Sequence, residues 1–160
     1  MRKATMLKTF AAVVVAVSSV GCSLAAGSSA STARCLDGRQ AALKAGGFSG
    51  PLLCDGPRAS FKLAGTIRGT KQSYLAYDYR YQFMPEGGNV LHGGQRVLVL
   101  TSEGRYVGQY ALTPPPPLDV AVNDVAIVIS IGGDPKGTIE FKDGPPPEAF
   151  VDGDKLTFFK

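Results

Sequence analysis

The sequence contains few of the groups that metal and hydrolytic sites need. Its 160 residues include one histidine, His92, and three cysteines. Cys35 and Cys54 with one imidazole do not complete a four-ligand zinc site unless carboxylates join them. No serine lies in a Gly-x-Ser-x-Gly turn, which excludes the nucleophile elbow of a serine hydrolase. We therefore expect no metal site.

A phosphate-binding loop is also missing. The stretch from Gly65 to Lys71 has its two glycines four residues apart and a threonine directly before the lysine. A phosphate loop requires the spacing Gly-x-x-x-x-Gly-Lys. This mismatch excludes nucleotide binding there, and we expect no cofactor.

Long hydrophobic runs are missing as well. The apolar run near the start covers residues 10–17, which is eight residues, whereas a membrane-spanning helix needs roughly 20. The run follows the basic residues Arg2, Lys3 and Lys8 and precedes a stretch of small residues. This order is typical of a secretory signal peptide. We predict that residues 1–21 direct export and are then removed.

Little positive charge remains outside the predicted signal peptide. The chain has 17 Lys and Arg, and removing the three at its start leaves 14 against 13 Asp and Glu. Nucleic-acid binding needs a concentrated basic surface, so we expect no nucleic-acid partner. The charge is uneven, because residues 22–112 carry ten basic and five acidic side chains while residues 113–160 carry four and eight.

The segment Ser19-Val20-Gly21-Cys22 closes the predicted signal peptide. Apolar and small residues directly before a cysteine resemble the lipidation signal of bacterial lipoproteins. The resemblance implies that Cys22 receives diacylglycerol, becomes the mature N-terminus and anchors the chain to a membrane. Ser23 replaces the aspartate that holds some lipoproteins at the inner membrane, which implies the outer membrane in a cell that has one.

Cleavage at another position is the alternative. Cleavage after Ala25 or Ala26 would discard Cys22 and leave an ordinary secreted periplasmic protein without lipid.

With either cleavage, Cys35 and Cys54 remain in the mature chain, and an even pair of cysteines in an exported chain predicts a disulfide. The bridge would close a loop of about 20 residues and stabilise the fold by roughly 3 kcal/mol.

The chain accordingly divides into three segments. Residues 1–21 are the predicted signal peptide, and residues 22–33 contain the lipidation site and an uncharged tether. An uncharged stretch of this length spans about 18 Å on average. Residues 34–160 are long enough for one domain with its own core.

One short helix is expected at the start of this domain. Within residues 36–47, Asp37 is a suitable N-cap and Gly46-Gly47 is a stop signal around helix-favouring residues. No later segment has sustained helical spacing.

The rest of the domain has the residue alternation of strands. The clearest alternation lies within residues 73–84, and Glu103-Gly104 predicts the turn of a hairpin. Gly65 suggests a bulge, and the uniformly apolar run from Val97 to Leu100 predicts a central strand covered on both faces. Other strands are expected within residues 58–69, 118–131, 138–142 and 155–159.

These patterns predict a mainly β fold. About seven short strands separated by turns, without alternating helices, indicate a small antiparallel β-sandwich or barrel with one short N-terminal helix. The alternation does not distinguish a sandwich from a barrel.

The candidate binding residues are a tyrosine row and the histidine. Tyr77, Tyr79 and Tyr81 share one face of their strand, where they form either a recognition surface or, as we favour, part of the core. His92 is the candidate for proton transfer at neutral pH, but its Gly-rich surroundings favour a residue in a turn.

Acidic and proline-rich turns offer two further hypotheses. Asp152 and Asp154 could bind calcium, but they lack the other positions of an EF-hand loop, so we interpret them as turn residues. The runs Pro114–Pro117 and Pro145–Pro147 form either ridges for a partner or, as we favour, rigid loops that protect sheet edges.

The function we expect from these features is binding rather than catalysis. The chain would be a cell-envelope lipoprotein whose β-domain binds a protein or a cell-wall component. The alternatives are an envelope enzyme using His92, a periplasmic protein without lipid, and a structural or stress-protective surface protein.

Overall fold

The computed structural model of the chain describes residues 40–50, 59–113 and 117–160. Cys22, Cys35 and Cys54 lie outside the described residues, as do the predicted signal peptide and tether. The predicted lipidation and disulfide therefore remain predictions.

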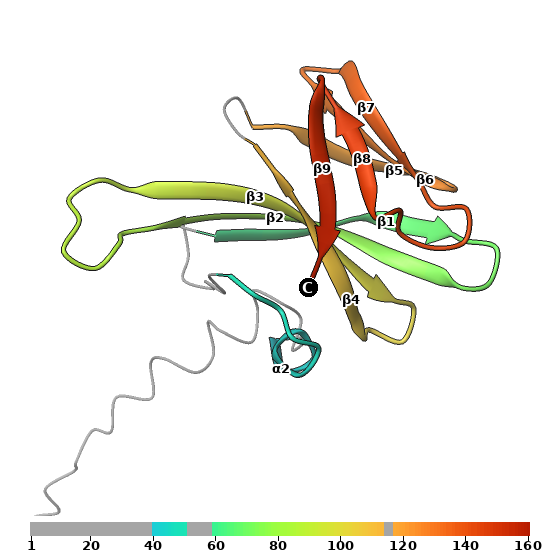
Figure 1. Cartoon of the computed structure of the whole chain (residues 1–160), viewed down its shortest axis with the longest axis horizontal. Coiled ribbons are helices and arrows are strands. Elements are labelled where there is room, and N and C mark those ends of the chain that lie inside the picture. Colours follow the sequence, from blue (N-terminus) through green and yellow to red (C-terminus); the bar gives the residue numbers. More distant parts are fainter. Residues whose placement is uncertain (1–39, 51–58, 114–116) are drawn as a thin grey trace, which may run out of the picture.

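The described residues form one short helix and nine strands (Figure 1). A mainly β, antiparallel fold is therefore confirmed. The expected number of about seven strands was too low, chiefly because β8 is four residues long and follows a proline run. In chain order the elements are α2 (Gln40–Ala45), β1 (Ala59–Arg68), β2 (Ser73–Phe83), β3 (His92–Thr101), β4 (Tyr106–Leu112), β5 (Asp119–Asn123), β6 (Ala126–Ile131), β7 (Asp134–Glu140), β8 (Glu148–Val151) and β9 (Asp154–Phe159).

The strands form two antiparallel sheets. The larger has six strands in the order β1-β2-β3-β4-β9-β8, and the smaller has three in the order β5-β6-β7. The predicted central strand is confirmed, since β3 lies between β2 and β4. The predicted bulge is also present, because the register of β1 against β2 shifts between Leu63 and Gly65.

Alternate residues of β3 belong to two different cores. Val97 and Val99 are fully buried between the two sheets, together with Ile127 and Ile139 of the smaller sheet. Leu98 and its neighbours on the same side pack on the outer face of the larger sheet instead. The larger sheet thus has an apolar layer on each face.

Helix α2 covers part of that outer face. Its Leu43 is fully buried against the outer layer, and Phe48 packs there just after the helix. The helix ends at Ala45, directly before the predicted Gly46-Gly47 stop. Gly47 has a φ of 87°, and its N–H donates to the Lys44 carbonyl, which ends the helix as expected of a glycine stop. No helix among the described residues is long and apolar enough to span a membrane.

The two sheets approach each other closely along two pairs of edges. At the first, a Cβ on Gly65 of β1 would lie 2.6 Å from the Cβ of Val122 in β5. At the second, the N–H of Asp152, directly after β8, donates to the Lys136 carbonyl of β7 at 2.8 Å. Neither contact extends into continuous strand pairing, so the fold is a sandwich rather than a closed barrel.

Candidate functional site

The tyrosine row lies on the outer face of the larger sheet. Tyr77 and Tyr79 are buried there beside the residues under α2, whereas Tyr81 is half-buried. The row thus changes along β2 from a covered core to an accessible surface.

The aromatic rings of this row lie next to one another along the strand. Tyr79 and Tyr81 stack with centroids 5.2 Å apart, and Phe83 lies 6.2 Å beyond Tyr81. The imidazole of His92 follows at 5.9 Å from the ring of Phe83. One face of the Tyr81 ring is therefore occupied by Tyr79, and the rings beyond it are tilted neighbours.

Beyond Tyr81 the β2–β3 hairpin continues without neighbouring strands among the described residues. The pairing of β1 with β2 ends at Tyr81, and that of β4 with β3 ends at Gln95. We call the remaining residues 82–94 the arm. Figure 1 shows the arm extending away from both sheets at one end of the molecule.

The end of the arm carries exposed apolar side chains. Met84 is 45% exposed, Val90 62% and Leu91 49%. Glu86 is the one Lys, Arg, Asp or Glu among residues 82–94. Exposed apolar side chains grouped with so little charge make the end of the arm a candidate interaction site.

His92 lies in a strand, which corrects the expected turn position. It is the first residue of β3 and pairs with Phe83 of β2. The glycines after it permit this pairing, because a Cβ on Gly94 would lie 2.6 Å from the Tyr81 ring. Its side chain is exposed on the arm and lines neither of the two hollows described below.

Arg96 lies at the base of the arm and holds it in place. This residue was not identified from the sequence. Its guanidinium lies 5.6 Å from the Tyr81 ring centre and 5.9 Å from that of Phe48. It also donates to the Ser49 carbonyl at 2.6 Å and to Gln109 Oε1 at 2.9 Å. The alternation of β3 places Arg96 on the same face as Leu98, and this could have shown that its side chain lies on the outer face of the larger sheet. Arg96 joins the segment after α2 to the sheet.

A cluster of polar side chains lies on the opposite face of the larger sheet, beside the base of the arm. The amide of Gln95 donates to Asp78 Oδ1 at 2.8 Å and to the Leu118 carbonyl at 2.6 Å, and it accepts from the Leu118 N–H at 3.0 Å. Arg80 donates to the other oxygen of Asp78 at 2.9 Å. These bonds fix the chain where it crosses between the sheets.

Tyr106 carries a buried hydroxyl beneath α2. Among the described residues this oxygen has no hydrogen-bond partner. Burial raises the pKa of Tyr106 to about 12, although the nearby positive charge of Arg96 acts in the opposite direction.

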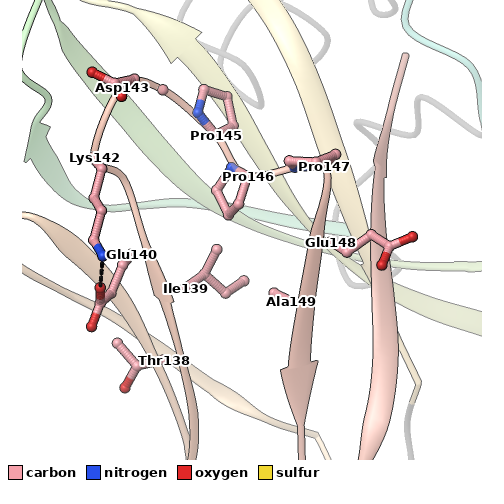
Figure 2. A pocket seen from close by; sticks show the side chains of 11 residues that line it. Thr138, Ile139, Glu140, Lys142, Asp143, Pro145, Pro146, Pro147, Glu148 and Ala149 are labelled. Atoms are coloured by element: carbon pink, nitrogen blue, oxygen red, sulfur yellow. Dashed lines mark ion pairs between the residues drawn. The ribbon is translucent and has the colours of Figure 1, made fainter.

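A groove of about 570 Å³ lies where β7 and β8 separate (Figure 2). Figure 2 shows Ile139 and Ala149 between the two strands and the three prolines above them. The proline loop is held in place, because the Tyr110 hydroxyl donates to the Pro146 carbonyl at 2.7 Å. Pro145–Pro147 therefore form one rigid wall of the groove.

The rim of this groove is charged. Lys142 and Glu140 form an ion pair at 3.8 Å on one side, and Glu148 pairs with Lys155 on the other. A second hollow of about 490 Å³ lies beyond this rim and shares Glu140 and Lys142.

Among the described residues, the acidic turns bring no three His, Cys, Asp or Glu side chains together in a group that could hold a metal ion. Asp152 and Gly153 have φ values of 52° and 85° and form the tight turn between β8 and β9, as the turn interpretation expected.

A comparison of the chain with known protein families, curated proteins and solved structures found no match. The function must therefore be argued from the arm, the groove and the sequence.

Proposed function

We propose that the chain is an exported, lipid-anchored protein of the bacterial cell envelope whose β-domain binds a partner through the arm. The observation that carries the proposal is the group of exposed apolar side chains at the end of a projecting hairpin. Large exposed apolar patches on soluble domains often mark interaction sites, and the grouping of these side chains on one projecting hairpin supports such a role.

The geometry favours a protein over a cell-wall glycan as the partner. Sugars bind to exposed faces of aromatic rings, but Tyr81 stacks on Tyr79, and Phe83 has Tyr81 and His92 as tilted neighbours. The arm instead offers the exposed side chains of Met84, Val90 and Leu91, which suit an apolar cleft on another protein.

The position of His92 supports binding over catalysis. A catalytic histidine usually lies in a concave pocket beside a carboxylate or a nucleophile. His92 is exposed on the arm, and neither hollow includes it. This exposed position on the arm is the observation that leads us to propose binding rather than the envelope-enzyme alternative.

Site-specific cross-linking in cells would test this proposal. A photoreactive amino acid placed at Val90 should form a cross-linked product with another protein. The matched control is Leu63, which is 49% exposed but lies on β1 outside the arm. Equal cross-linking from both positions, or none from Val90, would refute a binding role for the arm.

The export and lipidation in the proposal need a separate measurement. Mass spectrometry of the purified native protein should find an acylated Cys22 as the first residue. An intact Met1 would contradict export. An unmodified N-terminus after Ala25 or Ala26 would favour the periplasmic alternative without lipid.

A further inference from the structure

We infer that the groove beside β7 is a second binding site, where β7 takes up a short, extended and basic peptide segment of another protein as an additional strand. This site is separate from the arm and goes beyond the proposed function. Three features of the groove support it: an open strand edge, a wall that cannot pair with that edge, and a net negative charge.

One edge of β7 has no strand beside it along the groove. β7 pairs with β6 alone among the described strands. On the β6 side, the Phe141 N–H donates to the Val125 carbonyl at 2.9 Å. Because the backbone groups of successive strand residues point to opposite sides, those of Thr138 and Glu140 point away from β6 and toward the groove that both residues line. They form an edge with which another chain can pair.

The open edge is short, because the chain closes it at both ends. At one end the Lys136 carbonyl accepts the Asp152 N–H at 2.8 Å. At the other end the Lys142 carbonyl accepts the Thr70 N–H at 3.1 Å. Residues 137–141 lie between these two bonds, so strand pairing is limited to a peptide segment of about three to five residues.

The loop above this edge cannot pair with it. Residues 145–147 are prolines, which lack the backbone N–H that a strand donates. The loop is also fixed, since the Tyr110 hydroxyl donates to the Pro146 carbonyl at 2.7 Å. The Phe158 N–H donates to the Pro147 carbonyl at 2.9 Å. The groove of about 570 Å³ is thus already formed, so that little of the protein has to become ordered when a peptide enters.

The groove offers mainly polar groups, which suit backbone pairing better than the insertion of an apolar side chain. Ile139 lies between the strands but is fully buried, so it presents little surface to a ligand. Thr138 and Glu140 are exposed. Extended peptides that add to a sheet edge gain affinity from main-chain hydrogen bonds, which an open edge of this kind supplies.

The charge of the groove favours a basic peptide. Among the described residues that line it, the carboxylates of Glu140, Asp143 and Glu148 outnumber the ammonium group of Lys142. Lys142 pairs with Glu140 at 3.8 Å, and Glu148 pairs with Lys155 of β9 at 2.6 Å. Asp143 has no ion-pair partner in the described parts of the chain, so its carboxylate is available to a lysine or arginine of the peptide.

NMR titration with synthetic peptides is the first test. The protein would be isotope-labelled residues 22–160 with Cys22→Ser, which is the proposed mature chain without its acyl group. The probes would be hexapeptides of the form Thr-Lys-X-Lys-X-Thr, in which X is Val, Tyr or Ser. We expect the amide signals of Thr138, Glu140 and Glu148 to shift. Solvent exchange of the Thr138 and Glu140 N–H groups should slow at least about fivefold, which is the direct sign of backbone pairing.

Two further peptides separate backbone pairing from charge attraction. The first keeps every side chain but carries N-methyl groups on all its internal amides, which then cannot donate hydrogen bonds. It should not bind. The second has Glu in place of both lysines and should bind at least about tenfold more weakly. If the N-methylated peptide bound as well as its parent, the contact would be ionic only and the inference would be wrong.

Variants of the protein test the groove itself. Thr138→Pro removes an N–H that points away from β6, so it should weaken peptide binding at least about tenfold while the pairing of β6 with β7 remains. Asp143→Asn should weaken binding about threefold. The matched control is Asp154→Asn, which removes the same charge from an exposed position outside the groove and should leave binding unchanged. Circular dichroism and thermal melting of each variant would separate lost binding from lost folding.

Other outcomes would overturn the inference. Absence of binding by all three basic peptides, or shifts confined to the arm, would exclude β7 as the binding edge. Equal weakening by Asp143→Asn and Asp154→Asn would show general charge attraction instead of a site. Slow exchange of the Thr138 and Glu140 N–H groups before any peptide is added would mean that another segment of the same chain already fills the edge.

The outcome for the groove is independent of the outcome for the arm. Leu91→Asp, which changes an exposed side chain of the arm, should bind the basic peptides as the parent chain does. A failed titration would leave the proposed function standing, because that function is tested by cross-linking from Val90. Absence of cross-linking from Val90 would refute the role of the arm and leave the peptide site of β7 in place.

Discussion

Gly137 of β7 lies so close to Val151 of β8 that a Cβ on the glycine would be 2.9 Å from the Cα of Val151. The same Cβ would lie 2.6 Å from the Phe150 carbonyl oxygen. These neighbours are backbone atoms and cannot rotate away. The absence of a side chain at residue 137 therefore allows the two sheets to meet at this edge.

Gly137→Val should destabilise the fold by about 1–3 kcal/mol, because the added atoms would force β7 and β8 apart. Urea unfolding would measure the loss. Thr138→Ala is the control, since the neighbouring Thr138 is exposed and its truncation removes no packing. A Gly137→Val variant as stable as the parent chain would show that the edges are not in close contact.

Two tyrosines should respond in opposite ways to loss of their hydroxyls. Tyr106 has a buried hydroxyl without a partner among the described residues, so Tyr106→Phe should be neutral or stabilising by up to about 2 kcal/mol. The Tyr110 hydroxyl donates to Pro146, so Tyr110→Phe should cost about 1 kcal/mol. Thermal unfolding of both variants would test the contrast, which equal destabilisation would contradict.

Alkaline pH should destabilise the protein through Tyr106. Burial raises its pKa to about 12 from 10.0, so the folded chain keeps a proton that the unfolded chain releases. The stabilising effect is fully present below pH 10 and is lost as the pH rises through 12. Urea unfolding at pH 9 and about pH 11 should therefore show a decline that is smaller in Tyr106→Phe. An identical decline in both chains would assign it to other groups.

The buried amide of Gln95 should be among the most sensitive positions of the larger sheet. Gln95→Leu keeps a similar volume but leaves Asp78 Oδ1 and the Leu118 N–H without their partner. We expect a loss of about 2–4 kcal/mol, since unpaired buried polar groups are costly. Gln82→Leu is the control, because Gln82 is exposed. Similar stability of the two variants in urea would show that the Gln95 amide is not needed.

Short-range patterns predicted the strands well because alternation and turn residues act locally. The alternation within residues 73–84 correctly placed Leu75, Tyr77 and Tyr79 on one face of β2. Gly46-Gly47 ended the helix, and Glu103-Gly104 connected β3 to β4, where the sequence placed them. Each of these features depends on residues that are close together along the chain.

The candidate site was less predictable. The sequence pattern gives Tyr79 and Tyr81 the same position on one face of their strand. Tyr79 is nevertheless buried and Tyr81 only half-buried, because α2 and the residues around it cover only part of the row. His92 was expected in a turn because its glycines resemble a loop, but they allow β3 to continue beneath the Tyr81 ring.

The sequence alone determined that this protein is mainly β, where most strands turn, and which side chains share a face of each strand. Only the tertiary structure decided that the sheets form a sandwich and that β7 and β8 separate into a groove. It also decided that β2 and β3 extend past the described parts of β1 and β4 to form the arm. The physical reason is that the alternation of apolar and polar residues shows only which side chains lie on the same face of a strand. It carries no information about how far the strand beside it extends or what packs on each face.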